Sequence, residues 1–404
     1  MTSLGSRIRA LRKKKKLTLE SLAGNQLTKG MLSLIENDKA KPSMESLNYI
    51  AKRLDVEVNE LLQEISVTEL REILNDVSPQ FEQKNYKNVY EKLNSIIKLE
   101  LPLSIEAGKI LTWFGMSSFY LGKNDWNIYL EKAEQIYLSL NLFNEATKIH
   151  SFIMYTKMKN FDYEDALRFV REKRKFFKEK NITLNVLAEL DLSYNEVILL
   201  FAIGKYDEAA NQLTSAISLS KEKNILYRID HLYRVAYFYA MINGVDEDMN
   251  YYLHKLSLLA EFLESEELKW VVYFFKAEYL LEISHQYDKA ITYIEQLSNI
   301  DSIDPSFEMY YSIVKGKYLF RMNQYEEALQ YLLKIQDYPN DHVHPFDLSI
   351  HYVIYAYISL CYYRLNKFEK AMNYIDIAKK YMEPLPTTPY KRFVEETFHI
   401  VKTT

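Results

Sequence analysis

The chain has 404 residues, a formal net charge of −4, and only one cysteine, nine glycines and nine prolines. A single cysteine excludes a disulfide framework and favours a reducing compartment, while the lack of a long apolar run or an apolar leader argues against a membrane span or secretion. The sequence shows no phosphate-binding glycine loop and no Cys/His metal-ligand spacing. We therefore expect a cytoplasmic protein without metal, cofactor or enzymatic activity.

The first elements predicted along the chain form a helix-turn-helix. Thr18 can cap a short helix that ends at Ala23, residues 24–26 supply a turn, and Thr28 can cap a second helix that runs to Glu36. Apolar residues of both helices share one side, and small or basic residues at the start of the second helix point outwards. A helix of this kind can enter the major groove of DNA.

The sequence on both sides of this motif also predicts helices. Ile8, Leu11 and Leu17 recur at helical spacing upstream, and a further amphipathic helix follows Ser43. Residues 1–54 contain 12 Lys or Arg and 4 acidic residues, a net charge of +8, which leaves −12 for the rest of the chain. A basic end on an acidic protein favours nucleic-acid binding by that end.

Residues 4–62 resemble the Cro/C1-type (XRE) helix-turn-helix family. The residues that fit its pattern are Leu17, Leu22, Ala23, Ser33, Ile35, Glu36, Asn37, Lys39, Pro42, Ser43 and Leu47. The resemblance implies that Arg12 and Glu36 form an internal ion pair. It also implies DNA-facing positions for Thr28, Lys29, Gly30 and Ser33, with Lys39 and Lys41 near phosphates.

Three features depart from the pattern of this family. The turn is one residue shorter than usual, Asp38 replaces a common glycine, and Leu34 stands where a polar side chain often reads DNA. These departures leave the predicted fold intact and the operator sequence open.

The remaining sequence predicts one long helical array. A turn signature, consisting of a small or polar residue, an aromatic residue, an acidic residue and often alanine, recurs every 37 to 43 residues. Its aromatic position is occupied by Tyr86, Trp126, Tyr163, Tyr206, Tyr287, Tyr325 and Phe368, with Val245 in a weaker copy. A near-constant period of this length is typical of stacked helical hairpins.

This signature resembles the tetratricopeptide repeat, with hairpins a few residues longer than usual. The expected fold is all-α, with a five-helix Cro/C1-type domain followed by a right-handed superhelical solenoid of tetratricopeptide-like repeats. We expect a helix-turn-helix domain over residues 1–64, a helical linker over 65–76 and a peptide-binding and dimerisation domain over 77–404.

A DNA-binding end joined to such an array resembles the RRNPP family of peptide-pheromone receptors, most closely its neutral-protease regulator and pleiotropic virulence regulator type. This resemblance implies a homodimer or a higher oligomer that controls transcription. It also implies that a short linear signalling peptide binds in the repeat groove, in quorum sensing or in communication between phages.

Groove positions follow from the register of the repeats, about 18, 14 and 11 residues before each post-turn alanine. We expect Asn195 to be exposed there and to pair with the backbone of the peptide, and we expect cations such as Arg234 and Lys276 to attract a carboxylate. The predicted contacts, including neighbours one residue out of register, are Lys148, Asn195, Arg228, Arg234, Tyr237, Tyr273, Lys276, Tyr279 and Tyr310.

Two other functions remain open from the sequence. Repeat arrays of this kind also act as phosphorelay modulators that bind a response regulator. Alternatively, the chain is a scaffold that does not bind DNA and uses its N-terminal domain to dimerise.

Overall fold

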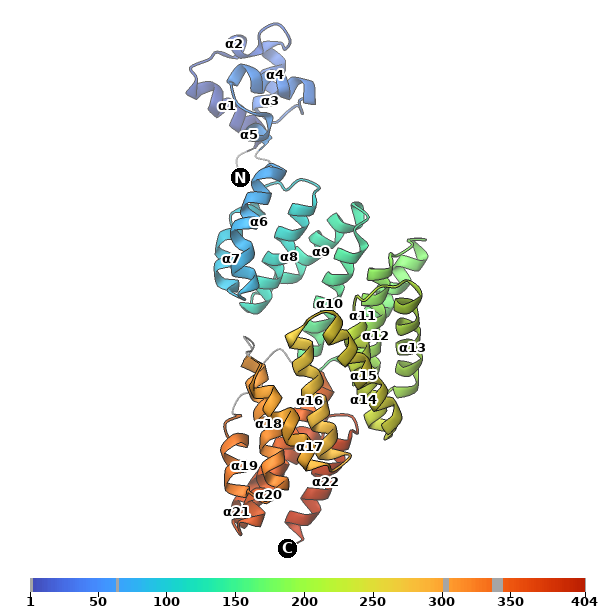
Figure 1. The fold of residues 1–404 in the computed structure, drawn as a ribbon. Helices are drawn as coiled ribbons and strands as arrows, with labels where there is room; N and C mark the ends of the chain where they lie inside the picture. The colour runs from blue at the N-terminus through green and yellow to red at the C-terminus, as the bar shows by residue number, and fades with distance from the viewer. Residues whose placement is uncertain (1–2, 63–64, 301–304, 336–343, 404) are drawn as a thin grey trace. The chain divides into compact units, whose positions relative to one another are not determined.

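The computed structural model describes residues 3–62, 65–300, 305–335 and 344–403. Within these residues the chain contains 22 α-helices, one short 3-10 helix and no β-strand (Figure 1). The helices divide between two compact units, Met1–Ile149 and His150–Thr404. The prediction of an all-α fold is confirmed, since every element in the described ranges is helical.

The first unit begins with five short helices and continues with longer ones. Its helices are α1 Leu4–Lys14, α2 Leu19–Ala23, α3 Lys29–Glu36, α4 Met44–Leu54, α5 Val58–Leu62, α6 Val67–Glu82, α7 Tyr86–Leu93, η1 Ile96–Lys98, α8 Ile105–Tyr120 and α9 Trp126–Ser139. Helix α10, Phe143–Lys159, runs from this unit into the second.

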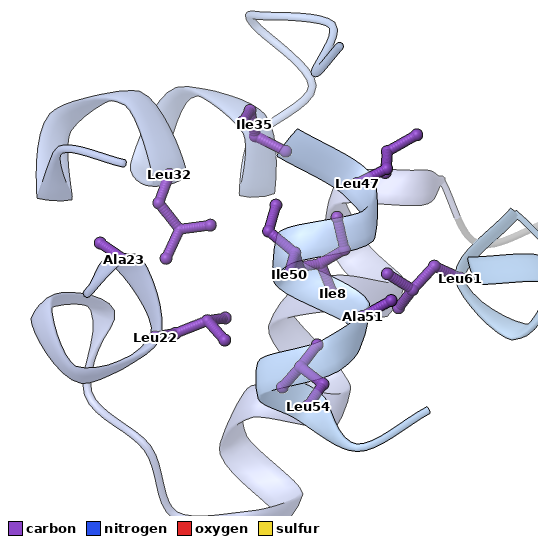
Figure 2. Close-up of a cluster of buried hydrophobic side chains, with 10 residues drawn as sticks. All are labelled: Ile8, Leu22, Ala23, Leu32, Ile35, Leu47, Ile50, Ala51, Leu54 and Leu61. Carbon is purple, nitrogen blue, oxygen red and sulfur yellow. The ribbon is translucent and has the colours of Figure 1, made fainter. Parts of the chain in front are cut away.

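Helices α1 to α5 enclose a small hydrophobic core of their own. Figure 2 shows its side chains pointing toward one another from all five helices. Thr18 and Thr28 cap α2 and α3 by accepting hydrogen bonds from the backbone N–H groups of Ser21 and Met31. The predicted helix-turn-helix is therefore confirmed, down to its two capping residues.

An ion pair between α1 and the end of α3 holds this domain together. The Arg12 guanidinium donates two hydrogen bonds to the Glu36 carboxylate, at 2.6 and 2.8 Å, and a third to the carbonyl of Leu17. The hydrogen bond to Glu36 is the main reason that the pKa of Arg12 is raised. The ion pair implied by the family resemblance is confirmed, and its forked geometry fixes the position of α3 against α1.

Asp38 explains one departure from the family pattern. Its φ of 56° lies in the left-handed region, where glycine is common and where aspartate is among the better tolerated residues. The Asp38 carboxylate accepts hydrogen bonds from the Gly5 backbone N–H at 3.0 Å and from the Ser3 hydroxyl. These two bonds lower the pKa of Asp38, so the aspartate supplies a link to α1 that glycine lacks.

Most of the predicted linker over residues 65–76 lies in α6, which begins at Val67 with Ser66 as its N-cap. The helix starts with a capping box, in which Ser66 and Glu69 each accept a hydrogen bond from the backbone of the other. Leu70, Leu74 and Val77 belong to one hydrophobic core shared with α7 and α8. The helix thus continues past residue 76 into the array, and the boundary predicted at residue 64 lies outside the described residues.

The second unit contains the longer part of the array. Its helices after α10 are α11 Tyr163–Glu179, α12 Val186–Ala202, α13 Tyr206–Glu222, α14 Ile229–Asn243, α15 Asp246–Phe262, α16 Glu266–Glu282, α17 Tyr287–Ser298, α18 Pro305–Arg321, α19 Tyr325–Leu332, α20 Pro345–Arg364, α21 Phe368–Met382 and α22 Pro389–Lys402. Consecutive helices pack pairwise as hairpins, and α22 packs against both α20 and α21.

The hairpin turns share one backbone conformation. In each turn, a residue one to four positions before the aromatic position has a positive φ between 53° and 75°, which ends one helix and reverses the chain. These residues are Lys84, Gly122, Phe161, Gly204, Gly244, His285, Asn323 and Asn366. The alanine that follows the turn is fully buried in five of the repeats, at Ala166, Ala209, Ala290, Ala328 and Ala371.

The aromatic residue of the turn packs back onto the helix before it. Tyr206 lies 6.1 Å from Phe201, Tyr325 lies 5.8 Å from Phe320, and Phe368 lies 5.6 Å from Tyr363, measured between ring centroids. In each pair the two rings are five residues apart in the chain. The turn signature therefore encodes a compact helical hairpin, as the sequence predicted.

We expect replacement of Glu36 by Gln to destabilise the N-terminal domain by about 3 kcal/mol, because it leaves the Arg12 guanidinium without its charged partner in a largely buried position. Hydrogen exchange of the α1 and α3 amides in the full chain measures this change. Arg9→Met is the matched control, since Arg9 is exposed on α1. Equal protection in the two variants would show that the ion pair contributes nothing to stability.

Candidate DNA interface and central cavity

The outward face of α3 carries the predicted DNA-facing residues. Lys29 and Gly30 are exposed in its first turn, and Ser33 is half-buried one turn later. The hydroxyl of Thr28 is exposed but already accepts the capping hydrogen bond from Met31 at 3.1 Å. A Cβ added at Gly30 would meet no atom within 4 Å, so the protein itself does not require glycine there.

Lys39 and Lys41 lie in the loop between α3 and α4, and both are exposed. Their positions next to the outward face of α3 suit contacts to phosphates, which position a protein on DNA without reading the sequence. Leu34 and Met31 on α3 are also exposed. Leu34 occupies a position from which a polar side chain often reads DNA in the family pattern, but it is not among the DNA contacts predicted from the sequence.

A cavity of about 380 Å³ lies among the helices of the second unit. We call it the central cavity, and its walls come from α14, α16, α18, α20 and α22. Its lining residues are Tyr237, Met241, Glu278, Tyr279, Glu282, Ile283, His285, Arg321, Val353, Tyr357, Pro389, Tyr390, Arg392, Phe393 and Glu396.

A buried network of charges supports one wall of this cavity. The Lys317 ammonium, which is fully buried, donates to both oxygens of Glu278 at 2.9 and 2.8 Å. The Tyr390 hydroxyl of α22 donates to the same carboxylate at 2.9 Å. Burial raises the pKa of Glu278 although Lys317 opposes this effect, so the carboxylate depends on both of its donors.

A second carboxylate extends the network. Glu282 accepts hydrogen bonds from Arg321 at 3.0 Å and from the Tyr357 hydroxyl at 2.6 Å. Burial acts to raise the pKa of Glu282, but Lys317 and Arg321 outweigh it, so the pKa is lowered. The Phe393 ring of α22 stacks on Tyr357 at 4.8 Å. Two acids and two bases thus neutralise one another beneath α22.

A smaller pocket of about 180 Å³ lies between α12, α14 and the first turn of α20. Its lining is mainly aromatic and aliphatic, with Phe238 and Phe346 in contact at 5.4 Å between ring centroids. His344 bonds through Nε2 to the carbonyl of Ile198 at 2.9 Å. Burial lowers the pKa of His344 and lowers that of His231 to about 4, so both imidazoles are neutral at pH 7.

The structure separates the residues predicted to bind a peptide. Tyr237 and Tyr279 line the central cavity, and Arg234 lines the smaller pocket. Tyr273 and Lys276 face α17 instead, where both lie close to the ring of Tyr293. Tyr310 packs on Phe274 of α16 at 5.1 Å, and Lys148 belongs to the first unit.

Asn195 is not the exposed groove residue that we expected. Only 1% of its surface is exposed, and its amide donates to the Ser151 hydroxyl at 2.7 Å. The register placed Asn195 on α12, and α12 is buried on most of its surface, so the expected exposure of this residue is wrong. A substitution at Asn195 therefore changes packing as well as any contact with a ligand.

The predicted cations do not form an unpaired basic wall either. Arg234 pairs with Asp230 and Arg228 with the buried Asp191, each at 2.9 Å. Lys148 pairs with Glu145 at the same distance. Each of these charges has a local partner, so attraction of an acidic ligand by net positive charge is weaker than the sequence suggested.

Among the described residues, no group of three or more His, Cys, Asp or Glu side chains is placed to hold a metal ion. The described helices also include none with the length and apolar character needed to cross a membrane.

Comparison with known proteins identifies the N-terminal domain. Residues 5–67 match the family described as a helix-turn-helix domain, and no match was found among curated proteins. Solved structures with similarity include PlcR of Bacillus thuringiensis in complex with the peptide PapR7 and DNA, at 21% identity and a TM-score of 0.38, over 67% of this chain and 99% of PlcR.

Two further structures show similarity at the same level. One is the competence regulator ComR of Streptococcus vestibularis with its signaling peptide XIP, at 18% identity and a TM-score of 0.33, over 67% of this chain and 96% of ComR. The other is the pheromone receptor Rgg2 of Streptococcus dysgalactiae, at 18% identity and a TM-score of 0.30, over 67% of this chain and 98% of Rgg2.

We expect Tyr390→Phe to destabilise the packing of α22 by about 1.5–3 kcal/mol, because it removes a hydrogen bond to the buried Glu278 carboxylate. Hydrogen exchange of the α22 amides in the full chain measures the effect. Tyr381→Phe on the exposed face of α21 is the matched control. If both variants exchange at the wild-type rate, the Tyr390 hydroxyl does not hold the helix in place.

Proposed function

We propose that this chain is a cytoplasmic transcription regulator, which binds DNA through its helix-turn-helix domain and is controlled by a short linear peptide bound in the central cavity. The observation that carries the proposal is the pairing of a helix-turn-helix in a basic N-terminal region, with a net charge of +8 over residues 1–54, with a cavity built by repeat helices. The match of residues 5–67 to the helix-turn-helix family supports the DNA-binding part.

The geometry of α3 supports binding in the major groove. A helix enters this groove with its first turns against the bases, and in α3 those turns present Lys29, Gly30 and Ser33, together with the exposed side chain of Met31. The excess of basic over acidic residues in 1–54 supplies the attraction to phosphates.

The central cavity suits part of an extended peptide. Its volume of about 380 Å³ lies in the range of small-ligand sites. Its wall combines aromatic rings with a neutralised charge network, so a bound peptide meets apolar surface and fixed hydrogen-bonding groups. Repeat arrays bind extended peptides on surfaces of this kind.

The path of α6 supports control of DNA binding by the array. A dimeric reader needs its two recognition helices about one DNA turn (~34 Å) apart. Helix α6 begins directly after the N-terminal domain and shares the core of α7 and α8. It can therefore transmit a change in the packing of the repeat helices to the N-terminal domain. We propose that the peptide changes this spacing in a homodimer, in a quorum-sensing or phage-communication circuit.

The DNA-binding part predicts that Lys29→Ala combined with Ser33→Ala weakens binding to fragments selected from a random DNA pool by about 5- to 150-fold per lost base contact. Thermal stability should stay close to wild type, because neither side chain is buried. Lys87→Ala, an exposed lysine on α7, is the control for loss of positive charge. Wild-type affinity of the double variant at fixed salt would show that α3 does not read the DNA.

The peptide-binding part is tested by filling the cavity. Ile283→Trp places a large ring among the lining residues, so peptides that wild-type protein selects from a pool of short linear peptides should lose at least tenfold in affinity, measured by calorimetry. Leu263→Trp is the matched control, because Leu263 occupies the same C-cap position on α15 as Ile283 does on α16, but is half exposed and lies outside the cavity.

DNA binding in the absence of peptide should be unchanged in Ile283→Trp and in Leu263→Trp. Equal peptide affinity of wild type and Ile283→Trp would move the site elsewhere in the array. Failure of the wild type to select any peptide, together with co-purification of a response regulator, would favour the phosphorelay alternative.

A further inference from the structure

The outward face of α3 carries a stripe of small and polar residues with one exposed leucine in its middle. Gly30, Leu34 and Asn37 are spaced four and three residues apart, so they follow one side of the helix. Leu32 and Ile35 lie on the opposite side and are buried in the core of the domain. Leu34 is 45% exposed, in the middle of the face that the proposed function turns toward DNA.

The fold does not account for this leucine. Its side chain lies outside the hydrophobic core of the domain, and the residues on both sides of it along the face are small or polar. An isolated exposed leucine needs no explanation on an ordinary surface. Here it stands where polar side chains can form hydrogen bonds to bases, and a leucine forms none.

One apolar group is available to such a side chain in the major groove. The C5 methyl group of thymine projects from the base edge, whereas the other edges present hydrogen-bond donors and acceptors. We propose that Leu34 is a specificity-determining residue, which selects thymine at one position of each half-site by contact with this methyl group. This inference rests on the proposed function.

Gly30 makes the contact sterically feasible. It lies one helical turn before Leu34 on the same stripe, and no protein atom lies within 4 Å of the place of its missing Cβ. The backbone of α3 can therefore come close to the base edges at Gly30, which brings the branched end of Leu34 within reach of the next bases. Lys29 precedes this stripe, and Lys39 and Lys41 follow it, all exposed and able to contact phosphates.

The test removes the methyl group from DNA and leaves base pairing intact. Fragments are selected from a random pool with the full chain, and the consensus is synthesised with deoxyuridine in place of thymidine at one position at a time. At one position per half-site, wild-type affinity should fall about fourfold, which corresponds to burial of a single methyl-sized group, about 0.8 kcal/mol.

Three substitutions test whether the difference in affinity between thymine- and uracil-containing DNA depends on the side chain of Leu34. Leu34→Ala should bind thymine and uracil at this position equally, while Ile128→Ala, which removes a similarly exposed apolar side chain on α9, should keep the fourfold difference. Met31→Ala should also keep it, because Met31 is exposed on the flank of α3 and not on its central stripe. The exposed position of Leu34 makes loss of folding in its variant easy to exclude by thermal melting.

The outcomes separate this inference from the proposed function. Equal wild-type binding of thymine- and uracil-containing DNA at every position would overturn the role of Leu34 while leaving DNA binding established. Persistence of the difference in Leu34→Ala, or its loss in Met31→Ala alone, would also overturn it. Failure of the full chain to select any DNA would instead contradict the proposed function itself.

Discussion

Close approach of two helices at each hairpin turn is the constraint on which the array depends. A residue with positive φ reverses the chain within a few residues, and a fully buried alanine lets the two helices touch. Where the next aromatic ring packs back on the preceding helix, it fixes their angle. Because each hairpin buries its apolar side only against its neighbours, repetition of this one turn produces the array and its internal surfaces.

A network of buried charges forms part of the wall of the central cavity. Glu278 and Glu282 are stabilised by Lys317 and Arg321, so four ionisable groups lie in the interior without net charge. Removal of one partner of such a network costs far more than the intact network contributes. The network therefore acts as a rigid wall, and α22 is fastened to it through Tyr390. A ligand of the central cavity would meet this paired network together with the exposed side chains of Arg392 and Glu396.

In the N-terminal domain, contacts at both ends of the short helix α3 hold it in a fixed position with its outward face exposed. Helix α3 has eight residues and would not be stable alone. Its start is capped by Thr28, its end is fixed to α1 through Glu36, and the residue Asp38 beyond it bonds back to Gly5. With these three points fixed, the outward side chains of α3 need contribute nothing to the fold and are free to serve recognition.

The sequence alone determined the helix-turn-helix, its caps and the period of the array, because each depends on residues close together in the chain or on a repeated local signal, whereas the Arg12–Glu36 ion pair, 24 residues apart, followed from the family resemblance. It could not determine that α12 is buried on most of its surface, or that Arg228 pairs with Asp191, which is 37 residues earlier in the chain. It gave no signal for the bond between Tyr390 and Glu278, which are 112 residues apart. Such contacts depend on how helices distant in the sequence pack against one another. That packing formed the cavity and left Asn195 buried, whereas helical periodicity fixed only the order of residues around each helix.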